Sequence, residues 1–156
     1  MNQIVYNPTI SLTKGYYFTY RASSYKVGDI VLFCVGDITQ ARVMHKLGLP
    51  YINGECVHNT PYLMKRIVAM ANDVVEITAL GILVNGHLLP NSIPLLNYRM
   101  VKLPRIRMKK VKLKMDEFLV MGQTAHSYDS RYFGIIKEAQ IYHEAYLLLA
   151  LNSPIL

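Results

Sequence analysis

Two serines and a lysine, far apart in the sequence, are the residue types that could do chemistry together in this chain. Ser11 stands near the N-terminus, Lys65 interrupts an apolar run, and Ser127 lies in a hydroxyl-rich segment, residues 122–134, that begins and ends with glycine. A serine hydroxyl is a weak nucleophile until a base takes its proton, and a third group often orients that base. These residue types predict a Ser-Lys hydrolase site.

Lys65 is the candidate base of this site. It lies in the run LMKRIVA, where a strand would place it on one face with Leu63 and Ile67. Burial disfavours a charged amine and lowers its pKa from about 10.4 by as much as ~3–5 units. A neutral amine can then act as a general base near neutral pH. The alternatives are a lysine that reaches solvent from a strand edge, with Arg66 doing so from the other face, and a simple loop serine at Ser11.

Asp129 and Arg131 carry opposite charges in the same segment as Ser127. A surface pair of this kind contributes little to stability, about 0–1 kcal/mol. We therefore expect these two residues to shape the loop and to take no part in the chemistry.

Short strand signals dominate the rest of the chain. Apolar runs bounded by turn residues predict strands, and the dipeptide Asn85-Gly86 is a strong hairpin signal between two of them. The segment 37–47 is the best helix candidate. The pattern predicts a mainly β domain over residues 1–156, an antiparallel barrel or sandwich with little helix. The predicted strands are 29–35, 63–69, 74–77, 82–84, 87–89, 117–121 and 134–142.

Positive charge is concentrated in residues 99–114. This segment has eight basic residues and no acidic one, which accounts for most of the net charge of +7. Its apolar residues mostly alternate with the basic ones, so half-buried strands are predicted, with Pro104 on an edge or at a break. Anionic lipid headgroups would attract such a stripe by about 1 kcal/mol per basic residue, and a merely solvated strand face is the alternative. We do not expect nucleic acid as a partner, because only Tyr98 borders the segment with an aromatic ring.

The cysteines and the apolar content give information on metal binding and on nearness to a membrane. Cys34 and Cys56 are compatible with one disulfide or with two buried thiols, and their spacing fits no zinc motif, so no metal is expected. The apolar fraction of 52% favours a protein near a membrane. A spanning helix needs about 20 apolar residues, and the run 67–84 is broken by Asn72, Asp73 and Glu76.

Four sequence segments resemble conserved blocks of the type I signal peptidases, in the same order and with roughly the same spacing. The blocks are NPTISLTKGYY around Ser11, GDIVLF after it, LMKRIVA with the later DVV, and the last segment from Gly122 to Gly134. The likeness is greater still to the conjugative-transfer branch of that family, the TraF-type pilin-processing peptidases. Three features favour this branch: Gly15-Tyr16-Tyr17 after the serine, the positions of the two cysteines, and the compact size.

The resemblance implies a role for each candidate residue. Ser11 would be the nucleophile, Lys65 the general base, and Ser127 the residue that orients the lysine. The Thr9 hydroxyl and the Ser11 backbone N–H would form the oxyanion hole. Beside them would stand a structural pair and a cysteine pair: Asp129 with Arg131, and Cys34 with Cys56. The family fold is mainly antiparallel β, uses no cofactor, and takes an extended peptide as an added strand, cut after small residues.

The same resemblance implies a biological setting. Members of this branch mature a pilin or another exported precursor for a type IV secretion channel, at the periplasmic face of the inner membrane, and some join the new end into a cyclic pilin. The family carries a membrane anchor ahead of the serine, and here ten residues precede Ser11, so we expect that anchor to be missing from this chain. Departures from the family pattern occur at Thr13-Lys14, Ala71-Asn72 and Gln123-Thr124. A non-catalytic component of the secretion apparatus and a housekeeping-type signal peptidase are the alternatives.

Overall fold

A computed structural model describes residues 1–52 and 55–151 of the chain, and one large antiparallel sheet runs through them. Among the described residues this sheet has seven strands in the order β1-β2-β15-β3-β6-β13-β14. It ends at β1 and β14, so it is an open sheet and not a closed barrel. Its strands are β1 (Gln3–Asn7), β2 (Gly15–Tyr20), β3 (Ile30–Phe33), β6 (Leu63–Ala69), β13 (Glu117–Met121), β14 (Ile136–Lys137) and β15 (Ile141–Ala150).

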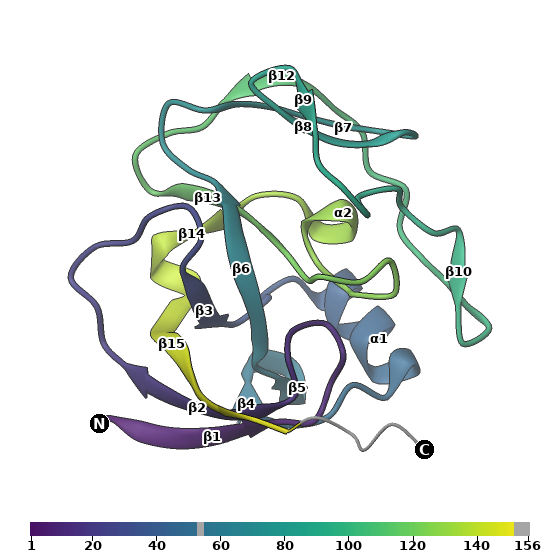
Figure 1. The fold of residues 1–156 in the computed structure, drawn as a ribbon. Helices are drawn as coiled ribbons and strands as arrows, with labels where there is room; N and C mark the ends of the chain where they lie inside the picture. Colours follow the sequence, from purple (N-terminus) through teal and green to yellow (C-terminus); the bar gives the residue numbers. More distant parts are fainter. Residues whose placement is uncertain (53–54, 152–156) are drawn as a thin grey trace.

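A smaller four-stranded sheet lies at the opposite end of the molecule from β1, β2 and β15 (Figure 1). Its strand order is β12-β7-β8-β9, and the described chain adds two short strand pairs. The strands of the small sheet are β7 (Val74–Thr78), β8 (Gly81–Val84), β9 (His87–Leu88) and β12 (Met108–Lys112). The short pairs are β4 (Glu55–Cys56) with β5 (Thr60–Pro61), and β10 (Asn97–Tyr98) with β11 (Val101–Lys102).

Helices are short and connect the strands. The helix α1 (Ile38–Leu47) begins where the Asp37 carboxylate accepts hydrogen bonds from two backbone N–H groups, and it ends at Gly48 in the left-handed conformation. It buries Ala41, Met44 and Leu47 on one face. The others are α2 (Ser130–Phe133) and the 3₁₀ helices η1 (Val57–Asn59) and η2 (Glu138–Gln140).

The core is thickest around the central strands β3 and β6. All four residues of β3 are buried, because apolar clusters cover both faces of the large sheet there. Phe33 packs in the cluster that contains the α1 residues Met44 and Leu47, and Leu32 belongs to the cluster on the opposite face. This buried centre fixes β6, and therefore Lys65, in a rigid position.

The predicted mainly β, antiparallel domain with little helix is confirmed. The strands predicted at 63–69 and 117–121 have the same bounds in the structure, and the helix predicted at 37–47 is α1 with Asp37 as its cap. The hairpin between β8 and β9 turns at Asn85 and Gly86, which both have positive φ, as a two-residue turn of this type requires.

Two strand predictions were wrong in detail. The segment 134–142 is interrupted by η2, and the strand that follows it continues to Ala150. In the basic segment, Pro104 does lie at a break, in the irregular stretch between β11 and β12, but the predicted alternation is not kept. A register shift between Met108 and Val111 breaks the two-residue alternation, so Lys109 and Lys110 are both exposed.

Candidate active site

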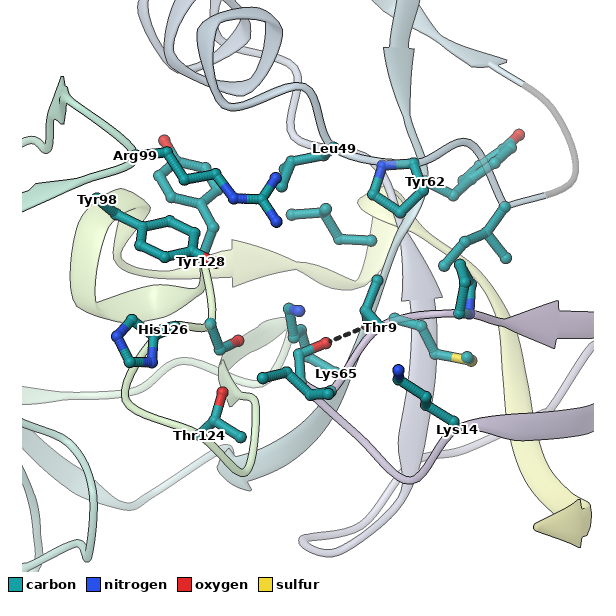
Figure 2. Close-up of a pocket in the computed structure, with 18 residues that line it drawn as sticks. Thr9, Lys14, Leu49, Tyr62, Lys65, Tyr98, Arg99, Thr124, His126 and Tyr128 are labelled. Carbon is teal, nitrogen blue, oxygen red and sulfur yellow. Dashed lines mark hydrogen bonds between the residues drawn. The ribbon is translucent and has the colours of Figure 1, made fainter. Parts of the chain in front are cut away.

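A cavity of about 380 Å³ opens between the loop that follows β1, the strand β6 and the loop that precedes α2. Thr9, Ser11, Lys65 and Ser127 all line it, so the structure brings together residues from three widely separated parts of the sequence. Figure 2 shows Lys65 in the middle of this pocket, with Thr9 on one side and Thr124 and His126 on the other. The remaining lining is mostly apolar, from Ile10, Leu49, Pro50, Ile52, Tyr62, Leu63 and Met64.

The loop that carries Ser11 is held in place by Asn7 at the end of β1. The Asn7 amide donates to the carbonyls of Thr9 and Thr13, both at 3.2 Å, and its Oδ1 accepts from the Thr9 backbone N–H at 3.1 Å. The Ser11 carbonyl accepts from the backbone N–H of Gln123 at 2.6 Å. The serine loop is therefore fixed both to its own strand and to the loop that carries Ser127.

The hydroxyls of Thr9 and Ser11 lie 2.8 Å apart (Figure 2, dashed line). The Thr9 hydroxyl also lies 2.8 Å from Asn7 Oδ1, which can only accept a hydrogen bond. Thr9 must therefore give its single proton to Asn7, and in this state Ser11 donates to Thr9. A substrate oxygen that takes the Thr9 proton would have to compete with Asn7.

Lys65 is a buried amine in the middle of β6. Its residue is 5% exposed, and it pairs with Val31 in the central part of the sheet. Burial lowers the pKa of Lys65 to about 8. Two smaller effects oppose each other: the Asp129 carboxylate raises this pKa and the Arg131 guanidinium lowers it. The neighbouring Arg66 is partly exposed and donates to the Gly28 carbonyl at 2.6 Å. The two adjacent cations thus have very different surroundings.

The Asp129–Arg131 pair is fully buried, which corrects the expectation of a surface pair. The two charged groups are 2.7 Å apart with no exposed side-chain area. Asp129 also accepts from the Gly122 backbone N–H at 2.9 Å. Arg131 donates to four carbonyls, those of Asn91, Thr124, Ala125 and Ser127. The pair therefore shapes the loop 122–131 from inside, and this loop presents Ser127 to the pocket.

Ser127 is buried, and its hydroxyl has no hydrogen-bond partner among the described residues. It does not hydrogen-bond Lys65 in this state. Thr124 also lines the pocket, and its buried hydroxyl likewise has no partner within residues 1–52 and 55–151. Buried hydroxyls are almost always hydrogen-bonded in proteins. Each of these two hydroxyls is therefore available to hydrogen-bond a water or another molecule in the pocket.

Cys34 and Cys56 form a disulfide in the structure, with their Cα atoms 5.6 Å apart. It closes a 22-residue span that contains α1 and the pocket residues Leu49, Pro50 and Ile52. The covalent bond thus ties this wall of the pocket to the end of the buried strand β3.

Seven polar or aromatic residues of the pocket had no role in the site predicted from the sequence: Lys14, Tyr62, Tyr98, Arg99, Thr124, His126 and Tyr128. The β10–β11 hairpin brings Tyr98 and Arg99 to the site, and the Tyr98 ring packs on His126 at 5.2 Å. The proximity of His126 to Ser127 in sequence was a usable signal. The approach of Tyr98 and Arg99 depends on a tertiary contact that no local pattern reveals.

The described residues contain no cluster of three or more His, Cys, Asp or Glu side chains that would suit a metal ion. Within the same ranges, none of the helices has the length and apolar character needed to cross a membrane.

Comparison with known proteins gives the class of this chain. Residues 5–149 match the family described as signal peptidase, peptidase S26. The chain therefore belongs to this peptidase family.

Two relatives are plasmid transfer proteins TraF from Escherichia coli, which confirms the resemblance to the TraF-type branch. One is 36% identical over 140 residues and the other 34% identical over 146 residues; each match covers 86% of this chain and 76% of the relative. A probable signal peptidase I-2 from Synechocystis is 26% identical over 130 residues, which cover 83% of this chain and 50% of that protein. A crystal structure of a signal peptidase I from Enterococcus faecalis is similar with a TM-score of 0.42 and 18% identity, over 78% of this chain and 96% of the other.

Proposed function

We propose that this protein is an endopeptidase with Ser11 as nucleophile and Lys65 as general base. The observation that carries the proposal is a buried lysine in the same pocket as a loop serine, with its pKa lowered to about 8. An amine with such a pKa is neutral in a useful fraction of molecules near neutral pH, so it can accept a proton from a hydroxyl. Membership of the peptidase S26 family supports this assignment.

The proposed reaction has two steps. Lys65 takes the hydroxyl proton of Ser11 while Ser11 Oγ forms a bond to the carbonyl carbon of the peptide. The C–N bond then breaks, the leaving amine takes the proton from Lys65, and an acyl-enzyme remains at Ser11. Lys65 then takes a proton from a water molecule whose oxygen adds to the acyl carbon. The bond between this carbon and Ser11 Oγ breaks, Ser11 takes the proton from Lys65, and the carboxylic acid is released. An amine in place of water would give a joined chain, provided that the acyl-enzyme is shielded from water.

Two neighbours would assist these steps. The Ser11 backbone N–H and the Thr9 hydroxyl would stabilise the negative oxygen of the tetrahedral intermediate. For this, Thr9 must redirect its proton from Asn7 to the substrate oxygen, and Ser11 must turn its proton from Thr9 to Lys65. Ser127, whose hydroxyl has no partner among the described residues, would orient the Lys65 amine once a substrate closes the pocket.

We further infer that the substrate is a pilin or another exported precursor of a conjugative or type IV secretion apparatus. The support is the sequence similarity to proteins named for plasmid transfer. The largely apolar pocket is suited to apolar side chains next to the cleaved bond. A role at the periplasmic face of the inner membrane agrees with this substrate and with the disulfide, since such bonds persist in oxidising compartments.

The basic segment 99–114 is our candidate for contact with the membrane surface. Its strand β12 is the edge of the small sheet, and four of its lysines are exposed: Lys109, Lys110, Lys112 and Lys114. Replacing them by Gln should weaken sedimentation with anionic vesicles and leave the weak binding to neutral vesicles unchanged. Equal binding to both kinds of vesicle would contradict this role.

The direct test of the enzyme is acylation by a peptide p-nitrophenyl ester that ends in Ala. Mass spectrometry should find the acyl group on Ser11, and the adduct should disappear in Ser11→Ala and in Lys65→Ala. Ser24→Ala and Lys46→Ala, at exposed positions, are the matched controls. No adduct in the folded protein at any pH would favour a non-catalytic component of the secretion apparatus.

A further inference from the structure

The pocket around Ser11 is lined by cations and by no acidic residue. Lys14, Lys65 and Arg99 all belong to its lining, and no described lining residue is Asp or Glu. The Asp129 carboxylate, which influences Lys65, is already paired with Arg131. The open part of the pocket therefore presents positive charge with no counterion from its own walls.

Arg99 is aimed at this pocket by the hairpin that carries it. The pairing of Tyr98 with Val101 leaves Arg99 and Met100 as a two-residue turn, and both have positive φ, of 48° and 63°. Turns of this type favour Asn and Gly, so a larger side chain with this backbone is strained. Strain of this kind is often found at functional positions.

Contacts of the Arg99 side chain fix its direction. Its guanidinium lies over the Tyr98 ring at 5.2 Å from the ring centre, and it donates to the Leu47 carbonyl at 3.3 Å. Neither Arg99 nor Lys14 takes part in an ion pair with a described residue. In Figure 2 the two cations lie on opposite sides of the pocket, with Thr9 and Lys65 between them.

We propose that Arg99 binds a carboxylate of the peptide substrate near the cleaved bond, which makes it a specificity-determining residue. This deepens the proposed function and rests on it, because the peptide must lie along the Ser11 pocket. A guanidinium presents paired donors that match a carboxylate, and an arginine remains charged at all relevant pH values. The carboxylate belongs either to an Asp or Glu side chain or to the C-terminal end of the peptide.

The test measures binding to the Ser11→Ala protein, so that no turnover is needed. The probes are fluorescent decapeptides of Ala and Leu, with one Glu or Gln moved through the three positions on each side of a central Ala-Ala bond. Each is made with a free C-terminal acid and with an amide. The peptides are compared in pairs, Glu with Gln and free acid with amide. In one such pair we expect the peptide with the carboxylate to bind about tenfold more tightly than the other, as for a single charge-assisted contact. This difference should shrink at high salt.

The variant Arg99→Gln should reduce the difference to less than twofold. Arg107→Gln, which removes an exposed cation of the same basic segment away from the pocket, should keep it. A preference in the Glu/Gln pairs identifies an acidic side chain, and one in the acid/amide pairs identifies a chain end. No preference in either arm, or one that survives in Arg99→Gln, overturns the proposal. Because the binding protein lacks Ser11, these outcomes are separate from those of the acylation experiment.

Discussion

Arg131 and Asp129 form an ion pair with no exposed side-chain area, and the guanidinium of this pair also holds four carbonyls of neighbouring loops. Two buried charges are costly to desolvate, and here the hydrogen bonds around them offset that cost. Their effect reaches the pocket because one of the four carbonyls belongs to Ser127. The geometry of the proposed site thus depends on a pair that does not itself line the pocket.

Arg131→Met should therefore be strongly destabilising. It leaves the Asp129 carboxylate buried without its partner, which costs about 3–5 kcal/mol, or roughly 6–20 °C in Tm for a domain of this size. Lys137→Met is the matched control, because the partners of Lys137 are 3.4 Å away and its side chain is 52% exposed. Thermal denaturation checks both variants. An equal Tm for the two would contradict a structural role of the buried pair.

Gly122 stands where a side chain would displace Ser127. A Cβ at this position would lie 2.5 Å from the Ser127 Cβ and 2.9 Å from the Ser11 carbonyl oxygen, and it would also press on the Ser127 hydroxyl. Gly122→Ala should therefore lower the rate of Ser11 acylation at least tenfold and cost about 1–3 kcal/mol of stability, as overpacking does. Gly36→Ala is the control, since a Cβ there meets only Val57, at 4.0 Å. An unchanged acylation rate in Gly122→Ala would show that the position of Ser127 is unimportant.

Thr9 should contribute through its hydroxyl and not through its shape. Thr9→Val keeps the size but removes the donor proposed for the oxyanion, so kcat should fall by about 10²–10³ with little change in KM. Thr9→Ser keeps the hydroxyl next to Ser11 Oγ and should retain most of the activity. Steady-state kinetics on a peptide substrate separates these results. Equal activity of the Val and Ser variants would exclude the Thr9 hydroxyl from the oxyanion hole.

Local signals explain which elements the sequence predicted. The strand at 63–69 is a long apolar run, the helix α1 has an Asp cap, and the Asn85-Gly86 turn has residues that accept positive φ. The strands β1 and β2 were missed because apolar residues lie on both of their faces. In β1 the buried Val5 lies between the exposed Ile4 and Tyr6, so hydropathy does not alternate although burial does.

The site was predictable as a set of residues but not as a geometry. The order of the blocks pointed to Ser11, Lys65 and Ser127, yet no local pattern distinguishes a buried lysine from one at a strand edge. Lys65 is buried because β6 pairs with β3, whose Val31 lies opposite Lys65 although the two residues are far apart in the sequence. Arg99 reaches the pocket in the same non-local way, through its own hairpin and the end of α1.

Acylation of Ser11 should increase with pH and reach half of its maximum near the pKa of Lys65, about 8. The reason is that only the neutral amine can take the proton of the serine. In Lys65→Met no adduct should form at any pH between 6 and 10. Rates of adduct formation between pH 6 and 10 give the two profiles. A midpoint at 10 or above in the wild type would contradict a buried, neutral base.

The same lysine should make the stability of the fold depend on pH. Between the folded pKa of about 8 and the ordinary value of 10.5, the unfolded chain binds more protons, so the free energy of unfolding rises as the pH rises through this window. Below pH 8 the folded state bears the full cost of burying the charged Lys65 amine, roughly 3 kcal/mol of the free energy of unfolding. Lys65→Met should therefore be more stable than the wild type at pH 7, and the gap should narrow at pH 10.

Urea denaturation of both proteins at the two pH values measures this gap. Lys46→Met, at an exposed position of α1, should show no comparable change and controls for the loss of a lysine. A gap of the same size at pH 7 and at pH 10 would mean that Lys65 stays hydrated in the folded protein. An amine in water keeps an ordinary pKa, so that result would also remove the physical basis for its role as the base.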